Sequence, residues 1–374
     1  MSEWKKVRLG EIANYVNEKI DIKAFDTSLY ISTDSMLKDK GGIGTPESIP
    51  ESGKVTKYQH NDILVSNIRP YFKKIWFSNR EGGCSNDVLV FRANDNIDST
   101  FLYYVLSDDS FFDHMMSSAN GTKMPRGNRK LIPSFEIPLP PLSTQHRIAS
   151  ILSRYDSLIE NYQKQIKLLE EAAQRLYKEW FIDLRFPGHE NTKIVEGLPE
   201  GWEKMKVGEL IAKVPRSKQI PTKDYQKKGV IPIIDQSRDY IAGYTDDMES
   251  KVESNEPYIV FGDHTRILKY VPFPFAKGAD GTQLIMSNNL DLMPQCLLFT
   301  SLVNVDLSNY SYARHFKYLK EEIIPVPTAS IANVFSRHVG KWYAKIQQNI
   351  YQLRLLTEAR DRLLPKLLSG EIEV

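Results

Sequence analysis

The sequence predicts an α+β protein with two similar α/β domains, joined by two long antiparallel helices that form a coiled coil. Three observations predict this fold: a heptad pattern of apolar residues that occurs twice, a proline-containing lead-in before each copy, and a shared opening of the two globular blocks. At 374 residues, the chain is long enough for two or three domains.

The first heptad stretch runs from Thr144 to Trp180, and neither glycine nor proline follows until Pro187. Ser143 precedes it and is a residue type favoured at a helix N-cap. Apolar residues recur at alternating steps of four and three, at Ile148, Leu152, Tyr155, Ile159, Tyr162, Ile166, Leu169, Ala173, Leu176 and Trp180. Such a seam requires a partner helix.

A shift of 187 positions places the same pattern on Val339, Trp342, Ile346, Asn349, Leu353, Leu356, Arg360, Leu363 and Leu367. The second helix is expected to begin near Ser330, and Pro365 is expected to bend or end it. A single heptad helix would favour a core helix or a dimerisation coil, whereas two copies favour an intramolecular pair. The polar seam residues Asn349 and Arg360 would fix its register at some cost in stability.

The two blocks share an opening and a close. Trp4–Ile12 resembles Trp202–Leu210 at an offset of 198, and Ile137–Pro140 resembles Ile324–Pro327 at an offset of 187. The blocks therefore differ in internal length, as expected where a common frame carries variable, specificity-giving segments. We predict recognition-type domains at 1–142 and 187–328, and spacer helices at 143–186 and 329–374.

The first block predicts strands at Asp62–Ser66 and Val88–Phe91, a turn at Gly82–Gly83, a helix at Phe101–Leu106 and a polar loop at Asn120–Lys130.

The second block predicts strands at Val230–Ile234 and Tyr258–Phe261. The apolar run between Arg266 and Lys277 is expected to be largely core, and Cys296–Phe299 a buried strand or helix segment. Pro138–Pro141 is interpreted as a linker into the first long helix.

Composition excludes several classes. The formal net charge is +2, so any basic surface is local. Cys84 and Cys296 lie far apart without metal-like spacing, which favours a reducing, cytoplasmic location. No signal-peptide pattern is recognised, and no stretch approaches the roughly 18 apolar residues of a membrane span.

A search for catalytic motifs favours a binding protein. No phosphate-binding Gly-x-x-x-x-Gly-Lys-Ser/Thr loop and no Asn/Asp-Pro-Pro-aromatic motif of amino-methyltransferases is present. Gly41–Gly44 is interpreted as a turn. The nearest match to a nuclease motif is Glu249–Lys251 with Asp235, and such triplets arise by chance. The seven histidines are scattered, so we predict neither catalytic residues nor a metal site.

The loops between strands are basic, rich in amides and interleaved with aromatics, as expected for contacts to phosphates and base edges. A solvated loop also explains any one of them. The candidate DNA-binding residues are Ser66, Asn67, Arg69, Lys73, Lys123, Arg126, Asn128 and Arg129 in the first block, with Arg216, Lys218, Gln236, Arg238, His264 and Arg266 in the second. Arg69, before Pro70, could instead stabilise its own domain.

Several segments resemble the specificity (S) subunits of type I restriction–modification systems. They are Pro138–Ala149, Trp180–Gly188, Leu363–Ile372, and the framework-like Ser66–Pro70, Gly262–Arg266 and Gly278–Gly281. The resemblance covers nearly the whole chain. It implies that each target recognition domain reads one half of a split double-stranded DNA target, and that the helices set the gap between the halves.

The resemblance also implies partners. Two methylation (M) subunits would dock on the helices and carry S-adenosylmethionine, and two restriction (R) subunits would bring ATP-dependent cleavage. S-adenosylmethionine, ATP and Mg are therefore expected on partner subunits, with no cofactor on this chain. Two alternatives stay open: a single-chain nuclease or methyltransferase fused to its recognition part, and a coiled-coil adaptor with two protein-binding domains.

Overall fold

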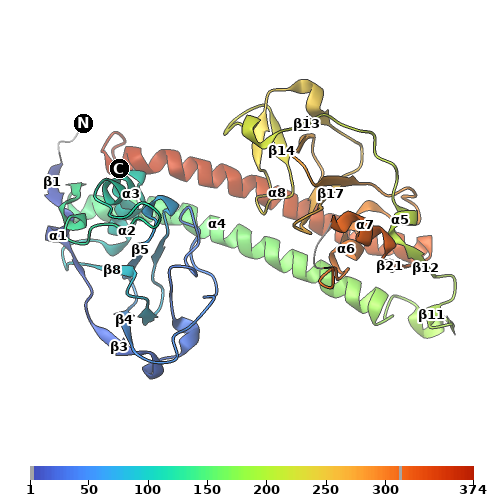
Figure 1. Ribbon diagram of the computed structural model, residues 1–374, viewed down its shortest axis with the longest axis horizontal. Coiled ribbons are helices and arrows are strands. Elements are labelled where there is room, and N and C mark those ends of the chain that lie inside the picture. Colours follow the sequence, from blue (N-terminus) through green and yellow to red (C-terminus); the bar gives the residue numbers. More distant parts are fainter. Residues whose placement is uncertain (1–3, 311–313) are drawn as a thin grey trace. The chain divides into compact units, whose positions relative to one another are not determined.

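The computed structural model of the protein describes residues 4–310 and 314–374. The chain forms two compact units, which we call unit 1 (Met1–Glu160 with Leu353–Val374) and unit 2 (Asn161–Gln352). Each unit contains one globular domain and a part of each long helix (Figure 1). The mixture of helices and short strands in each unit agrees with the predicted α+β class.

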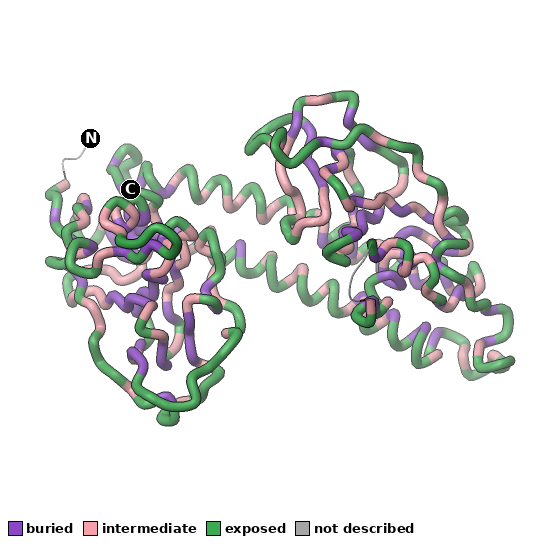
Figure 2. The backbone as a smooth tube through the Cα atoms, viewed as in Figure 1, coloured by how far each residue is buried: buried purple, intermediate pink, exposed green. Residues whose placement is uncertain are grey.

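The two long helices are α4 (Leu142–Tyr177) and α8 (Ala329–Leu368). A π-helical turn, Lys178–Ile182, continues α4. Every residue of the two predicted heptad seams is buried or half-buried, which confirms both seams. The positions of both helices outside the seams are largely exposed (Figure 2).

Within unit 1 the helices are antiparallel. Arg360 of α8 pairs with Asp156 of α4 at 2.7 Å, while Leu367, further along α8, shares a core cluster with Ile148, nearer the start of α4.

Within unit 2 they are antiparallel as well. Asn349 donates a hydrogen bond to Gln165 at 3.1 Å, and the ring of Phe335 lies 5.7 Å from that of Trp180. The intramolecular pairing expected from the repeat is therefore confirmed in each unit.

The structure corrects one prediction about the helix ends and excludes one of the two possibilities expected at Pro365. The first backbone bonds of α4 are accepted by the Pro141 carbonyl, so Ser143 lies inside the helix and is not its N-cap. Pro365 lies inside α8, which continues to Leu368. Leu367 and Leu368 are buried in the core of unit 1, and this packing supports the last turn despite the missing donor.

Unit 1 contains two antiparallel sheets and a two-stranded ribbon. The larger sheet has the order β2 (Ala13–Tyr15), β8 (Val88–Ala93), β5 (Ile63–Ser66), β6 (Ile75–Phe77). The smaller has the order β3 (Lys19–Asp21), β4 (Lys54–Tyr58), β7 (Gly82–Cys84), and the ribbon pairs β1 (Lys5–Arg8) with β9 (Glu136–Leu139). Its shorter helices are α1 (Leu9–Ile12), α2 (Ser99–Ser107) and α3 (Asp109–Ser117).

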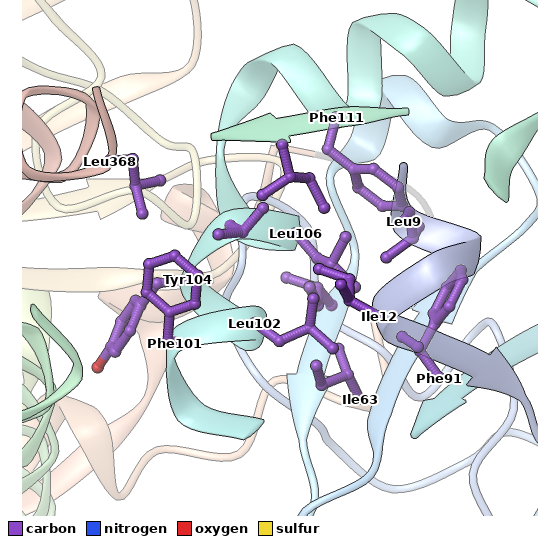
Figure 3. Close-up of a cluster of buried hydrophobic side chains, with 14 of the residues drawn as sticks. Leu9, Ile12, Ile63, Phe91, Phe101, Leu102, Tyr104, Leu106, Phe111 and Leu368 are labelled. Carbon is purple, nitrogen blue, oxygen red and sulfur yellow. The ribbon is translucent and has the colours of Figure 1, made fainter. Parts of the chain in front are cut away.

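The main core of unit 1 lies between the larger sheet and the helices. Figure 3 shows Leu102 and Leu106 of α2 close to Ile63 of β5, with Leu368 of α8 in the same cluster. Full burial of each such side chain contributes roughly 1.5–3 kcal/mol. The core therefore joins the globular domain of unit 1 to the helix pair.

Two sequence interpretations in this unit are wrong. Gly82 and Gly83 form part of strand β7 rather than a turn. A Cβ at Gly83 would lie 2.4 Å from the ring of Phe25, so the packing at this strand position requires glycine. Pro138 and Leu139 belong to strand β9 rather than to a linker. Pro138 is tolerated because β9 pairs with a single partner, β1, so one side of the strand needs no donor.

Unit 2 repeats the frame with a different filling. Its ribbon pairs β12 (Glu203–Lys206) with β21 (Ile323–Val326), and its central sheet has the order β18 (Leu268–Val271), β17 (Tyr258–Gly262), β20 (Thr282–Ile285). A further sheet has the order β13 (Gln219–Ile220), β19 (Phe275–Gly278), β14 (Ile231–Ile234), β15 (Gly243–Thr245). The short strand β16 (Lys251–Val252) also pairs with β19. Strand β19 is parallel to β13 and to β14. The remaining elements are β10 (Ile194–Val195), β11 (Leu198–Pro199), α5 (Val207–Leu210), α6 (Gln295–Val303) and α7 (His315–Glu321).

The predicted core segments of unit 2 are confirmed. Cys296–Phe299 belongs to helix α6, and Val271, Phe275 and Ala276 are buried. Within the described ranges, no helix is both long and apolar enough to cross a membrane.

Candidate nucleic-acid interface

Two equivalent positions organise the candidate sites: Asn67 directly after β5 and Asp263 directly after β17. The Asn67 amide donates to the Asp87 carbonyl at 2.8 Å, and the Asp263 amide donates to the Gly281 carbonyl at 2.7 Å. The carbonyl of each residue accepts a backbone N–H from a later segment. Both side chains are buried, so the frame holds them in the same way.

The two side chains differ in what they bond. Asp263 Oδ1 accepts the Phe316 amide at 2.7 Å, which anchors the start of α7. Asn67 Oδ1 is buried and has no hydrogen-bond partner among residues 4–310 and 314–374. A buried acceptor without a partner costs about 1–3 kcal/mol, and such orphan groups are found at functional sites.

Asn67 lines an open hollow of about 650 Å³ in unit 1, which we call the Asn67 hollow. Its lining is rich in amides and has two arginines: Asn67, Asn86, Asp87, Asn120, Gly121, Arg126, Gly127, Asn128 and Arg129. Four of the predicted residues, Asn67, Arg126, Asn128 and Arg129, are thus brought together. Asparagine and arginine are the residue types that form bidentate bonds to adenine and guanine edges.

The arginines of the hollow are held in place by acceptors. Arg126 Nη2 lies 3.2 Å from Asp87 Oδ2, and Arg129 donates to the Asn86 carbonyl. Both side chains remain exposed, so each retains donors that face solvent.

The other predicted residues of unit 1 lie outside the hollow. Ser66 is buried and donates to the Ile68 carbonyl at 3.2 Å. Arg69 adopts a left-handed φ of 50° and donates its amide to the Pro125 carbonyl at 2.8 Å, while its buried Nε has no hydrogen-bond partner among the described residues. Lys123 is exposed.

Lys73 is part of an ion-pair cluster. It pairs with Asp109 at 2.7 Å, and Lys40 pairs with the same carboxylate at 3.1 Å. Partial burial acts to raise the pKa of Asp109, but the bonds from both lysines outweigh it and lower that pKa below its ordinary value.

In unit 2, Gln236 joins two loops. Its Nε2 donates to the Asp280 carbonyl at 2.8 Å, and its Oε1 accepts the His264 amide at 3.1 Å. The side chains of His264 and Arg238 are exposed. Arg266 donates to the Leu307 carbonyl at 3.1 Å and lines a separate hollow of about 350 Å³.

Lys218 is held by carboxylates. Its ammonium lies 2.7 Å from Asp247 and 3.3 Å from Glu249, and hydrogen bonds to both raise its pKa. The residues of the nuclease-like motif each have a separate partner. Glu249 pairs with Lys218, Lys251 with Glu253, and Asp235 with Lys269.

Unit 2 also has a hollow that sequence reasoning missed, of about 730 Å³, which we call the four-cation pocket. Its polar lining consists of Lys213, Arg216, Ser217, Gln219, Lys277, Gln283 and Lys320. Only Arg216 was predicted, because the four cations come from three segments far apart in the sequence. A usable signal was Lys277, a cation within the otherwise apolar strand β19.

Comparison with known proteins decides the family. Residues 1–171 match the family described as the type I restriction modification DNA specificity domain. The MjaIX specificity subunit, from a type I restriction enzyme of Methanocaldococcus jannaschii, is 30% identical over 309 residues, which span 75% of this chain and 70% of that protein. The chain belongs to the type I restriction enzyme specificity subunits.

Other relatives agree with this membership. The HindI specificity subunit of Haemophilus influenzae is 27% identical over 192 residues, or 49% of this chain and 42% of that protein. The crystal structure of the type I restriction–modification S subunit from M. genitalium aligns with 98% of this chain and 96% of its own, with a TM-score of 0.62 and 18% identity, and so shares the fold. This specificity subunit is thus a DNA-recognition protein of a restriction–modification system.

Proposed function

We propose that this specificity subunit reads a bipartite double-stranded DNA target, with one half read by each recognition domain. The observation that carries the proposal is the Asn67 hollow, where a buried orphan acceptor and exposed arginines and amides meet at one strand end. In unit 2 the corresponding strand end presents His264, with Arg238 on the adjoining loop. These are the side chains we assign to base and groove contacts.

The remaining predicted residues receive other roles. Lys123 and Arg216 are exposed and suit phosphate contacts, whereas Ser66, Arg69, Gln236 and Arg266 mainly position loops through their bonds to the backbone. Lys73 and Lys218 are paired with carboxylates and contribute least to DNA binding.

The long helices act as the spacer and as the docking surface for two methylation subunits, and two restriction subunits complete the assembly. Domain boundaries at 1–142 and 187–328, with spacer helices at 143–186 and 329–374, follow from this division of labour. The chain itself performs no covalent step, and S-adenosylmethionine, ATP and Mg belong to the partners. The dispersed pairing of Asp235, Glu249 and Lys251 supports this assignment.

The test is a map of modified adenines in a host without restriction–modification systems, which co-expresses this chain with its cognate methylation subunit. We expect two short defined half-sites around a gap of fixed length. A continuous motif would contradict the two-domain reading. Absence of modification, with the complex shown to assemble, would favour the adaptor alternative.

A matched pair of variants tests the Asn67 hollow. Asn128→Ala removes an amide that lines it, and Asn96→Ala removes an exposed amide in the turn after β8. We expect the first to relax or abolish recognition in one half-site, at about 1–3 kcal/mol per lost bidentate contact, and the second to leave the motif unchanged. Equal modification maps for the two variants would remove the hollow from the base-reading assignment.

A further inference from the structure

The four-cation pocket of unit 2 differs in charge from the other hollows. Lys213, Arg216, Lys277 and Lys320 line it, and among the residues described no aspartate or glutamate does. By contrast, Asp87 lines the Asn67 hollow and Asp306 lines the hollow at Arg266. The pocket is therefore suited to an anion.

Lys277 is one of the two half-buried cations of the pocket. It lies in β19 between the buried Ala276 and Gly278, and its backbone pairs with Gln219 on one side and Ile234 on the other. Burial lowers its pKa, and no ion pair involves its ammonium within the described part of the chain. A half-buried cation without a counter-charge is unfavourable unless a ligand supplies one.

The neutral groups fit the same ligand. Ser217 Oγ is buried without a hydrogen-bond partner in the described residues, and Gln219 and Gln283 add amides to the lining. The ammonium of Lys320 lies 5.3 Å from the ring centroid of Phe316, which holds it at the wall of the pocket. Hydroxyl, amide and ammonium donors together form the usual set for phosphate oxygens.

We propose that the four-cation pocket binds phosphodiester groups of the DNA backbone and positions unit 2 on the duplex without reading bases. This inference rests on the proposed function. The pocket suits a polyanion better than one small anion, because Lys213 and Arg216 are exposed whereas Lys277 and Lys320 are half-buried. A DNA backbone that passes from the exposed to the half-buried side of the pocket would contact the two pairs of cations in turn.

The test uses Lys277→Gln in the full chain bound to its methylation subunit. Two duplexes serve as probes: one with the mapped target, and one with the half-site of unit 2 replaced. We expect affinity for both to fall by the same several-fold factor at low salt. The slope of log affinity against log salt should become less steep by about one unit, because one phosphate contact is lost.

Two variants control for folding and for non-specific charge. Lys277→Arg should retain the slope, because the positive charge is kept. Lys218→Gln removes a lysine two residues from Arg216, but one already held by Asp247 and Glu249, and should leave the slope unchanged. In the complex without substitutions, bound DNA should also protect Lys277 from acylation, as measured by mass spectrometry.

Each other result overturns the inference. A loss confined to the duplex with the intact target would make Lys277 a base-reading residue, and an unchanged slope would remove the phosphate contact. Stabilisation by inorganic phosphate that depends on Lys277, with DNA binding unaffected, would assign the pocket to a free anion. The adenine map keeps the two proposals apart, since a split motif with an unchanged Lys277→Gln slope rejects only this inference.

Discussion

The candidate recognition faces of the two units are built on the same frame but carry charge in different ways. In unit 1 the arginines of the Asn67 hollow are bonded to Asp87 and to the Asn86 carbonyl, and the group without a partner is a neutral acceptor. In unit 2 the equivalent acceptor, Asp263, is satisfied, whereas Lys277 of the four-cation pocket has no ion pair within the described part of the chain. The same frame therefore leaves a neutral acceptor unsatisfied in one unit and gathers cations around a hollow in the other.

The helix pair shows a second difference. In unit 1 the seam contains an ionic network, in which Asp156 accepts from Arg360 at 2.7 Å and from the Tyr104 hydroxyl at 2.6 Å. In unit 2 the seam contains an amide pair, Asn349 with Gln165, and Asn349 Oδ1 has no partner among the described residues. Both restrict register, and the first also bonds the seam to α2 of the globular domain through Tyr104.

The largest expected effect comes from exchange of residues 1–142 for the corresponding domain of another specificity subunit. One half of the modified sequence should change completely, while the other half and the gap stay the same. Adenine mapping measures all three. A change in both halves would contradict the independence of the two units.

Breaking the ionic network should destabilise unit 1 more than loss of the amide pair destabilises unit 2. Arg360→Leu leaves the carboxylate of Asp156 half-buried without its cation, and we expect a loss of about 2–3 kcal/mol. Asn349→Leu should be neutral or stabilising by up to about 1 kcal/mol, because the buried Oδ1 without a partner offsets the bond that Nδ2 donates to Gln165. Hydrogen exchange of peptides from the two halves of α4 reports each unit separately, and equal effects would remove this distinction.

Substitutions at the two equivalent strand ends should affect the two units differently. Asp263→Asn weakens a bond to the Phe316 amide, so α7 should lose protection from exchange, by about 1 kcal/mol. Asn67→Ala removes an orphan acceptor and should cost little stability but alter DNA recognition. If Asn67→Ala were the more destabilising variant, the assignment of the orphan group to function would be wrong.

The smallest effect is expected at the paired lysine of unit 1. Lys73→Gln should leave the salt dependence of DNA binding unchanged, as measured by titration at several salt concentrations. The pKa of Asp109 is lowered from 3.8 in the folded state, so the ionised carboxylate contributes to folding stability above pH 3.8. This contribution is lost as pH falls through the folded pKa. The free energy of unfolding of Lys73→Gln should therefore match that of the parent chain below this pH range. A difference in stability that persists in acid would point to another cause.

Periodicity predicted the elements better than it predicted the sites. The heptad seams, the strands at Ile63–Ser66 and Tyr258–Gly262 and the helix at Ser99–Ser107 follow from local patterns, and the structure contains them. Gly82–Gly83 was misread because glycine indicates a turn locally, whereas here the ring of Phe25, far away in the sequence, requires it. Pro138 was misread for a related reason, since a two-stranded ribbon leaves one edge of β9 free of pairing.

Site residues depend on tertiary neighbours that sequence patterns do not contain. Lys73 and Lys218 were chosen as basic loop residues, but each lies beside a carboxylate from another segment. Lys277 was not predicted because it borders an apolar run that was expected to be core, yet the fold brings it to the same hollow as Arg216. Only the folded chain distinguishes a neutralised cation from an available one.

The division of the chain between the units has a consequence for biosynthesis. Unit 2 is continuous in sequence, whereas unit 1 needs residues 353–374, which supply Leu364, Leu367 and Leu368 to its core. A ribosome therefore releases the complete sequence of unit 2 before that of unit 1, although the domain of unit 1 emerges first. Until then unit 1 exposes the apolar surface that these leucines cover, so chaperone binding during translation should concentrate on the earlier domain.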